Sequence, residues 1–176
     1  MKTKTLNLYT IDELEPKARE KALDSLRDNN DCPFLSDDMN NQLHELLQDH
    51  KITDHNDTSK PNTTPTQVLY SLGSCQGDGA CFEGTYSWKQ YTITITQHDH
   101  RYRHKYTTHI EIETQHGNDA KESVYDEFKS IYYKICDDLE SFGYAKIEYQ
   151  DSEEYLTEMC EANEYTFKSD GRMENL

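Results

Sequence analysis

Apolar residues at the start of the chain follow first a strand-like and then a helix-like spacing. Residues 2–9 alternate, with Leu6 and Leu8 on one face, which predicts a short strand. Residues 10–13 (TIDE) have the capping-box pattern and predict a single turn, after which Pro16 suits the first position of a helix. A break at residues 29–33 separates this helix from a second one.

Both helices have an apolar stripe that would face a core. The two stripes consist of Ala18, Ala22, Leu23 and Leu26 in the first helix and of Met39, Leu43, Leu46, Leu47 and His50 in the second. The second helix begins near Ser36, with acids in its first turn. Residues 53–66 (TDHNDTSKPNTTPT) have no periodicity and many turn formers, so we expect a mobile polar loop there.

Strand-like alternation dominates the middle of the chain. Residues 67–74 predict a strand that leads into a glycine-rich loop, and residues 85–97 predict a second strand. Residues 98–101 turn the chain, and residues 103–114 return as a third strand, which completes a long antiparallel hairpin. The side chains expected to face inward are Tyr91, Ile93 and Ile95, then Tyr106, Thr108, Ile110 and Ile112.

Helical spacing returns in the last third. Residues 119–142 predict a long helix that Gly143 ends as the residue after the C-cap. Its core stripe would be Val124, Phe128, Ile131, Ile135 and Leu139. The elements expected after it are a short extended segment at 144–149, an acidic helix at 151–163, a strand at 164–168, a turn at 169–171 and a frayed tail at 172–176.

The predicted order is β-α-α-β-β-β-α-α-β, with the central strands consecutive. Consecutive strands flanked by helices favour an α+β fold, in which about four to five strands form an antiparallel β-sheet and the helices pack on one face. The length of 176 residues suits one α+β domain that covers residues 1–176.

Charge narrows the classes of function. The chain has 34 acidic residues against 18 lysines and arginines, a formal net charge of −16. Residues 119–164 alone hold 14 acidic and four basic residues, a net charge of −10. This balance excludes a general nucleic-acid binder, because neutralising phosphates requires clustered cations. It fits a solubilising surface, a basic protein partner, or a mimic of nucleic acid.

The five cysteines are odd in number and widely spaced, and no CxxC pair suggests a zinc ribbon or a redox dithiol. Residues 1–10 lack the apolar region of a signal peptide, and no apolar run approaches the roughly 20 residues that span a bilayer. We therefore expect a protein of the reducing cytoplasm, with no membrane association and mostly buried thiols.

The most distinctive stretch is residues 69–84 (LYSLGSCQGDGACFEG), which has three interpretations. As a structural turn, it bends sharply at Gly77 and Gly79, Asp78 bonds nearby backbone amides, and Phe82 enters the core. As a binding edge, the same loop would contact a macromolecular partner.

The third interpretation makes Cys81 a nucleophile, because Asp-Gly-x-Cys also occurs in ovarian-tumour-type cysteine proteases. In those enzymes the cysteine opens a helix, where the dipole lowers its pKa. Here the residues after Cys81 are strand-like and Glu83 adds negative charge, which argues against that role. Adjacent carboxylates such as Asp137 and Asp138 diverge by roughly 100° on a helix, so they form no acid–base dyad. No G-x-S-x-G elbow or phosphate-binding G-x-x-x-x-G-K loop occurs, so we predict no catalytic residues.

Four histidines surround the predicted hairpin turn: His98, His100, His104 and His109. On a strand, His98 and His100 would point the same way and could share a metal. The cations Arg101, Arg103 and Lys105 would oppose it. We expect a basic, solvent-facing tip and neither a metal site nor a cofactor.

Several stretches carry a resemblance: residues 9–14 (YTIDEL), 16–22 (PKAREKA), 74–82 (SCQGDGACF) and 163–167 (NEYTF), the last ahead of Asp170-Gly171. Together they resemble a family of small acidic proteins from phages and prophages, often labelled "antitoxin of a toxin–antitoxin stability system". The similarity covers residues 8–171, and its most specific element is Q-G-D-G-A-x-F. The resemblance implies a phage setting and brings no catalytic residues with it.

In that setting we expect an acidic inhibitor that binds a host defence nuclease complex of the anti-CRISPR or anti-restriction type in the host bacterial cytoplasm. Its partner would be a basic nucleic-acid-binding protein, met through protein–protein contact. The predicted contact residues are Gln76, Asp78, Asp137, Asp138, Glu140, Glu153, Glu154, Glu158 and Glu161. The alternative is an antitoxin that neutralises a cognate toxin by direct binding, and a homodimer stays open.

Overall fold

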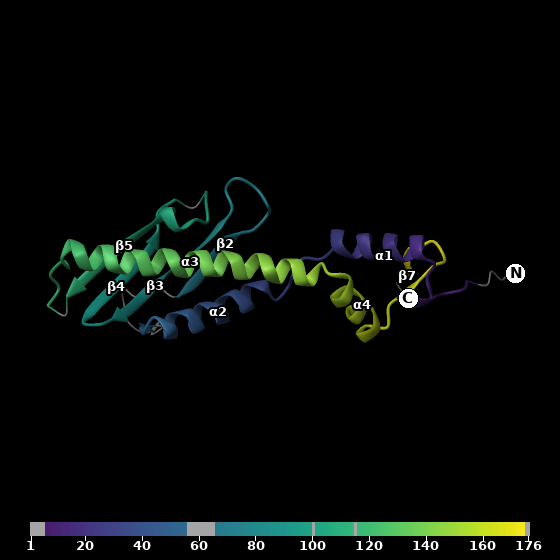
Figure 1. Ribbon diagram of the computed structural model, residues 1–176, viewed down its shortest axis with the longest axis horizontal. Helices are drawn as coiled ribbons and strands as arrows, with labels where there is room; N and C mark the ends of the chain where they lie inside the picture. Colours follow the sequence, from purple (N-terminus) through teal and green to yellow (C-terminus); the bar gives the residue numbers. More distant parts are fainter. Residues whose placement is uncertain (1–5, 56–65, 100, 115, 175–176) are drawn as a thin grey trace, which may run out of the picture. The chain divides into compact units, whose positions relative to one another are not determined.

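The computed structural model describes residues 6–55, 66–99, 101–114 and 116–174 (Figure 1). The chain divides into two compact units, which are Met1–Pro33 with Lys146–Leu176, and Phe34–Ala145. The α+β fold is confirmed, because helices accompany a five-stranded antiparallel sheet. The expectation that residues 1–176 form a single domain stays a prediction.

The sheet belongs to the unit Phe34–Ala145, which we call the sheet unit. Its strands are β1 (Ile52–Asp54), β2 (Gln67–Ser71), β3 (Gly79–Trp88), β4 (Tyr91–Gln97) and β5 (Thr108–Thr114). Strand β3 is central: β1 and β2 pair with one of its edges and β4 with the other, and β5 pairs with β4. All of these pairings are antiparallel, as the consecutive strands predicted.

Two helices, α2 (Leu35–Asp49) and α3 (Glu122–Gln150), cover one face of this sheet (Figure 1). The contact between α3 and β3 is largely aromatic. The ring centroids of Phe82 and Tyr132 lie 4.7 Å apart, and those of Trp88 and Phe128 lie 5.3 Å apart. Because Ile93 and Ile95 alternate with threonines along β4, they are fully buried on the same face, as predicted.

The central hairpins differ from the prediction in where the chain turns. Residues 85–97 are not one strand, because Lys89 adopts a left-handed conformation (φ 54°) and turns β3 into β4. No glycine or asparagine marks this turn in the sequence. The strand predicted at 103–114 begins only at Thr108, after the 3₁₀-helix η2 (Lys105–Thr107). Tyr106, predicted to face inward, is therefore 62% exposed, whereas Ile110 and Ile112 are buried.

Gly143 does not end the long helix, and the extended segment predicted at 144–149 is wrong. Helix α3 continues to Gln150. Gly143 lies where α3 crosses α2 and the segment after β2: a Cβ there would overlap Leu72 Cδ1 and lie 3.1 Å from Met39 Sδ. Glycine is thus required for close packing, which outweighs its cost of about 1 kcal/mol in a helix.

The other unit, which we call the helical unit, contains η1 (Ile11–Glu13), α1 (Pro16–Asp28), α4 (Glu153–Ala162), β6 (Thr166–Phe167) and β7 (Met173–Glu174). Pro16 opens α1 as predicted, and the Thr10 N–H donates to Glu13 Oε2 at 2.9 Å. The core of the helical unit is formed by Ile11, Leu14, Ala18, Ala22, Leu23, Leu156, Cys160 and Phe167.

Two terminal predictions change. No strand spans Leu6 to Leu8; only Tyr9 bridges, antiparallel to Phe167, and residues 2–5 lie outside the described part. The strand predicted at 164–168 shortens to β6, and the frayed tail predicted at 172–176 is wrong at Met173–Glu174, which form β7 and pair with β6. In the loop predicted at 53–66, residues 53 and 54 belong to β1, and 56–65 lie outside the described residues.

Candidate functional site

The glycine-rich loop between β2 and β3 is stabilised by hydrogen bonds to Asp78. The Tyr144 hydroxyl of α3 donates to Asp78 Oδ2 at 2.6 Å, and the Cys75 N–H donates to the same oxygen at 2.9 Å. The Ser71 hydroxyl donates to Asp78 Oδ1 at 3.3 Å. The hydrogen bond from Tyr144, joined by those from Cys75, holds the pKa of Asp78 well below its usual range. This bond also raises the pKa of Tyr144 to about 12.

These contacts confirm the structural-turn interpretation: Asp78 accepts from a backbone amide and Phe82 is fully buried. Gly79 needs its missing side chain, since a Cβ would lie 2.9 Å from the Arg103 carbonyl oxygen. The carboxylate of Asp78 is thus occupied by its own loop and α3, whereas Gln76 is exposed. Nothing in the sequence marked Tyr144 as the partner of Asp78.

Cys81 has the surroundings of a structural thiol. It lies within β3, not at the start of a helix, and its side chain is fully buried. Burial raises the pKa of Cys81 to about 12, which keeps the thiol protonated near neutral pH. The exposed cysteine of the loop is Cys75.

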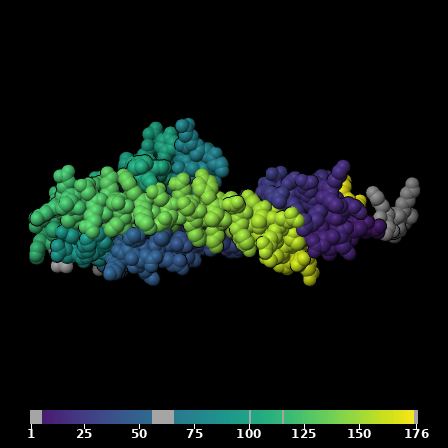
Figure 2. Space-filling model, in the orientation of Figure 1, coloured from purple at the N-terminus to yellow at the C-terminus, as the bar shows by residue number. Residues whose placement is uncertain are grey.

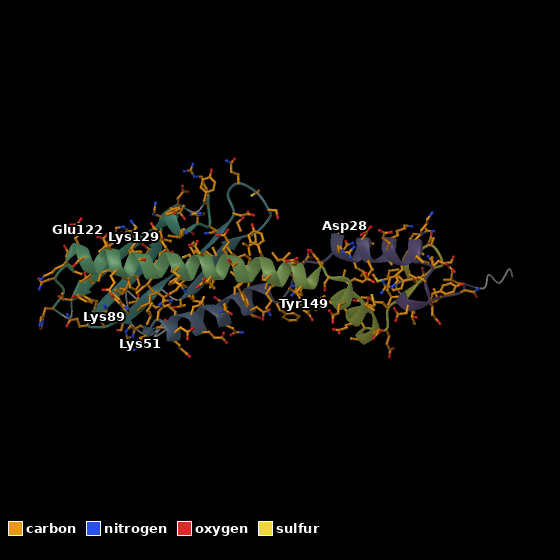
Figure 3. All side chains as sticks on the ribbon, in the orientation of Figure 1. Asp28, Lys51, Lys89, Glu122, Lys129 and Tyr149 are labelled. Carbon is orange, nitrogen blue, oxygen red and sulfur yellow. The ribbon has the colours of Figure 1, made fainter. Side chains whose placement is uncertain are left out.

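Part of the basic tip of the hairpin contacts α3. Lys105 forms an ion pair with Asp137 of α3, and its side chain is only 16% exposed. Its Nζ lies 5.5 Å from the ring centroid of Tyr133. Lys129, labelled in Figure 3, lies with its Nζ 5.6 Å from the same ring centroid. Arg101 stays exposed and pairs with Asp99.

The histidines around this hairpin do not converge. His104 stacks on Tyr106 with ring centroids 4.7 Å apart, and His109 pairs with Glu111 at 3.3 Å. His100 lies outside the described residues. Among the residues described, no group of three or more potential metal ligands comes together.

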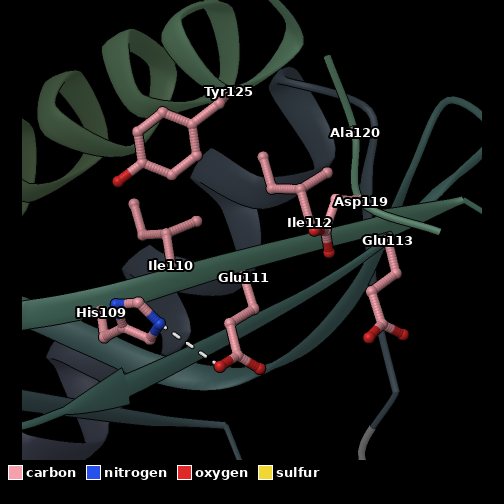
Figure 4. Close-up of a pocket in the computed structure, with 8 residues that line it drawn as sticks. All are labelled: His109, Ile110, Glu111, Ile112, Glu113, Asp119, Ala120 and Tyr125. Atoms are coloured by element: carbon pink, nitrogen blue, oxygen red, sulfur yellow. Dashed lines mark ion pairs between the residues drawn. The ribbon is translucent and has the colours of Figure 1, made fainter. Parts of the chain in front are cut away.

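Strand β5 borders a groove of about 360 Å³, shown in Figure 4. Tyr125 of α3 lies on one side, and Glu111 and Glu113 point to the other. The dashed line in Figure 4 marks the pair His109–Glu111, whose side chains are 61% and 62% exposed. None of the predicted contact residues lines this groove.

Three acids of α3 form ion pairs with nearby cations. Asp137 pairs with Lys105, and Asp138 pairs with Lys134 at 3.1 Å. Near the other end of the sheet, Glu127 pairs with Lys89 at 2.6 Å. Helix α3 runs along the face of the sheet unit that Figure 2 shows, and the charges of these three acids are balanced by their paired cations.

The acids of α4 are arranged differently. Glu153 pairs with Arg19 of α1. Glu154, Glu158 and Glu161 are spaced four and three residues apart, so they form one exposed stripe, while Leu156 and Cys160 face the core. No ion pair joins any of these three glutamates to a cation in the described part of the chain. We call them the α4 stripe.

The structure thus divides the nine predicted contact residues into two groups. Those in the sheet unit are Gln76, Asp78, Asp137, Asp138 and Glu140, and those in the helical unit are Glu153, Glu154, Glu158 and Glu161. Charge density in the sequence did not distinguish them, because ion pairing depends on cations elsewhere in the chain. No described helix has both the length and the apolar character that crossing a membrane requires. Searches against family models, curated proteins and solved structures found no match to this chain.

Proposed function

We propose that the protein binds a basic, nucleic-acid-binding surface of another protein through the α4 stripe and thereby keeps nucleic acid from that surface. In the phage setting that the sequence resemblance implies, the partner is a host defence nuclease complex of the anti-CRISPR or anti-restriction type. The observation that carries the proposal is the stripe itself: three exposed carboxylates in line, with no cation of the described chain paired to them.

The stripe is unfavourable for the helix that carries it. Like charges four residues apart, such as Glu154 and Glu158, destabilise a helix by about 0.2–0.5 kcal/mol. Glu161 lies in the last turn, where the helix dipole disfavours an anion by about 0.3–1 kcal/mol, and no basic residue occupies that turn. Arginines or lysines of a binding partner, such as those that line a phosphate-binding groove, would offset these costs.

Charge complementarity of this kind mainly increases the rate of encounter and the specificity of binding. A protein with a net charge of −16 approaches a cationic groove quickly at low ionic strength, and screening weakens the attraction as salt rises. Without a catalytic step, the inhibitor would act stoichiometrically, one molecule for each occupied surface.

The second candidate is an antitoxin whose partner is a cognate toxin with a basic surface. The resemblance to proteins labelled as antitoxins supports it. A toxin gene beside this one, and loss of viability when this gene alone is deleted, would favour the antitoxin over the nuclease inhibitor.

The test is affinity purification of the tagged protein from host lysate, at about 50 mM and about 500 mM salt, with identification by mass spectrometry. The stripe variant carries Glu154→Gln, Glu158→Gln and Glu161→Gln. The matched control carries Glu127→Gln, Asp137→Asn and Asp138→Asn, which remove the same charge from α3.

We expect the wild type and the control to retain a basic nucleic-acid-binding protein at low salt, and the stripe variant to lose it. Recovery of no such protein by the wild type, or equal loss with both variants, contradicts the proposal.

A further inference from the structure

We propose that an apolar pocket beside the C-terminal end of α4 is an anchor site for one arginine side chain of a basic partner. The identity of that partner rests on the proposed function, but the pocket can be tested without it. The pocket has a volume of about 330 Å³ and lies entirely within the helical unit.

The floor of the pocket is apolar. Ile11 of η1 and Cys160 of α4 line it, and each is only 2% exposed. Tyr165 and Thr166 form the adjoining wall. Burial raises the pKa of Cys160, so its thiol serves here as a small apolar group and not as a nucleophile.

The rim of the pocket is anionic. Glu161 and Glu164 line it and are exposed, and no cation of the described residues forms an ion pair with either. Both lie at the C-terminal end of α4, where the dipole favours a cation. An unbound cation site would show this arrangement: two carboxylates at the mouth and apolar surface beneath.

Glu164 adopts an unfavourable backbone conformation. Its φ of 55° puts it in the left-handed region, at the position after the C-cap where glycine is preferred. The Tyr165 N–H donates to the Cys160 carbonyl at 2.9 Å and fixes this turn. A glutamate kept in a strained position beside a pocket is consistent with a role for its side chain.

Arginine fits this combination better than other side chains. Its three methylene groups can bury against Ile11 and Cys160 while the charged end stays at the mouth. The planar guanidinium has five N–H donors, so it can serve two carboxylates that lie three residues apart, which an ammonium serves only as a point charge. Anchors of this kind, an arginine in a desolvated pocket, typically contribute most of the affinity of an interface. The α4 stripe continues from the rim and would meet flanking cations of the same segment.

The first experiment uses the full chain and a synthetic probe, the peptide Ac-KGSRGSK-amide, titrated at low salt into ¹⁵N-labelled protein. Three further peptides replace the central arginine by citrulline, by lysine, or by an arginine analogue with a one-methylene stem. We expect the arginine peptide to shift the amide resonances of Ile11, Cys160 and Tyr165, and the citrulline and short-stem peptides to bind at least about tenfold more weakly. The lysine peptide should bind with intermediate affinity. Shifts spread evenly over the acids of α3 and α4, or equal affinity for all cationic peptides, overturn the proposal.

The second experiment compares two variants that remove equal charge. Glu161→Gln with Glu164→Gln changes the rim, and Glu154→Gln with Glu158→Gln changes the two members of the α4 stripe that do not line the pocket. We expect the rim pair to lower affinity for the arginine peptide by about tenfold or more and the stripe pair by less than about threefold. An equal loss in both would mean that only net charge matters.

A third variant, Glu164→Gly, separates binding from folding. It should raise the melting temperature, because glycine tolerates the left-handed conformation, and it should still lower the affinity for the arginine peptide. Unchanged affinity contradicts a role for Glu164 at the rim.

The two proposals fail in different ways. If the arginine peptide binds as described but no basic protein is recovered from lysate, the pocket stands and the proposed function fails. If a basic protein is recovered through the α4 stripe but Glu164→Gly, which leaves the stripe intact, binds that protein and the arginine peptide as the wild type does, the anchor pocket fails and the proposed function stands.

Discussion

On α3, two of the three acids that we predicted as contacts, Asp137 and Asp138, are paired with cations of the sheet unit, whereas on α4 only one of the four has an ion pair among the described residues. Asp137 holds Lys105 and with it the base of the hairpin, and Asp138 holds Lys134. Among the four predicted residues of α4, Glu153 alone forms an ion pair with a cation of the described chain, Arg19. The two helices have the same net charge of −4, from seven acidic and three basic residues on α3 and from four acidic and no basic residues on α4, but they present different surfaces.

This difference shows that net charge alone is a poor guide to a binding surface. In the sheet unit, acids stabilise local structure: Asp78 organises the glycine loop through Tyr144, and Glu127 holds Lys89 at a turn. In the helical unit, the α4 stripe has no such partner among the described residues, and its member Glu161 lines an apolar pocket. Unpaired charge beside an apolar pocket is the more specific sign of an interface, because interfaces combine an apolar centre with a polar rim.

The largest expected effect comes from the leucines beneath the two acidic faces. Leu156 and Leu139 are both fully buried, so Leu156→Ala and Leu139→Ala should each lower the free energy of unfolding by about 2–5 kcal/mol. Urea denaturation measures this loss. At urea concentrations below the unfolding transition, only Leu156→Ala should lower the affinity for the arginine peptide, because of these two leucines only Leu156 belongs to α4. Equal weakening by both variants would end the distinction between the helices.

The second effect concerns the engaged carboxylate of Asp78. Because hydrogen bonds lower its pKa in the folded state, ionised Asp78 stabilises the fold above its unfolded-state value of about 3.9. That stabilisation is lost as pH falls from there through the folded-state value. Asp78→Asn should therefore lower the melting temperature at pH 7, and the difference from wild type should narrow in acid. Glu154→Gln, the control on α4, should show no such pattern; a similar pattern there would contradict the contrast.

The third effect compares two residues in left-handed conformation. Glu164→Gly should stabilise the protein by about 1 kcal/mol, since it removes a conformational cost. Lys89→Gly should give almost no gain, because Lys89 pairs with Glu127 and lies 4.2 Å from the ring centroid of Trp88. Thermal unfolding of both variants tests this, and a loss of stability in Glu164→Gly would show that Glu164 has a structural partner.

The smallest effect is that of single ion pairs on α3. Asp137→Asn and Asp138→Asn should each cost less than about 1 kcal/mol, as exposed pairs do. The loss should be larger for Asp137, because the side chain of its partner Lys105 is 16% exposed and that of Lys134 is 64% exposed. Denaturation at low and high salt measures both, and a cost well above this range would mean that the hairpin depends on the pair Lys105–Asp137.

The glycines show how much the sequence could predict about local structure and where it failed. A glycine after an apolar stripe usually ends a helix, and Gly143 follows such a stripe. The same residue also permits close approach, and here Met39 and Leu72 pack against it within a continuous helix. The Lys89 turn was missed because its left-handed residue is neither glycine nor asparagine.

By itself, the sequence determined the α+β class, the antiparallel order of the central strands, the start of α1 at Pro16 and the turn at Asp78, because periodicity, proline and short-range hydrogen bonding act between residues close in the chain. Only the tertiary structure decided which acids are free to bind. Arg19 and Glu153 are 134 positions apart, and Lys105 and Asp137 are 32 apart. Ion pairing across such separations depends on how the elements pack, and the pocket at the end of α4 likewise exists only where η1, α4 and β6 meet.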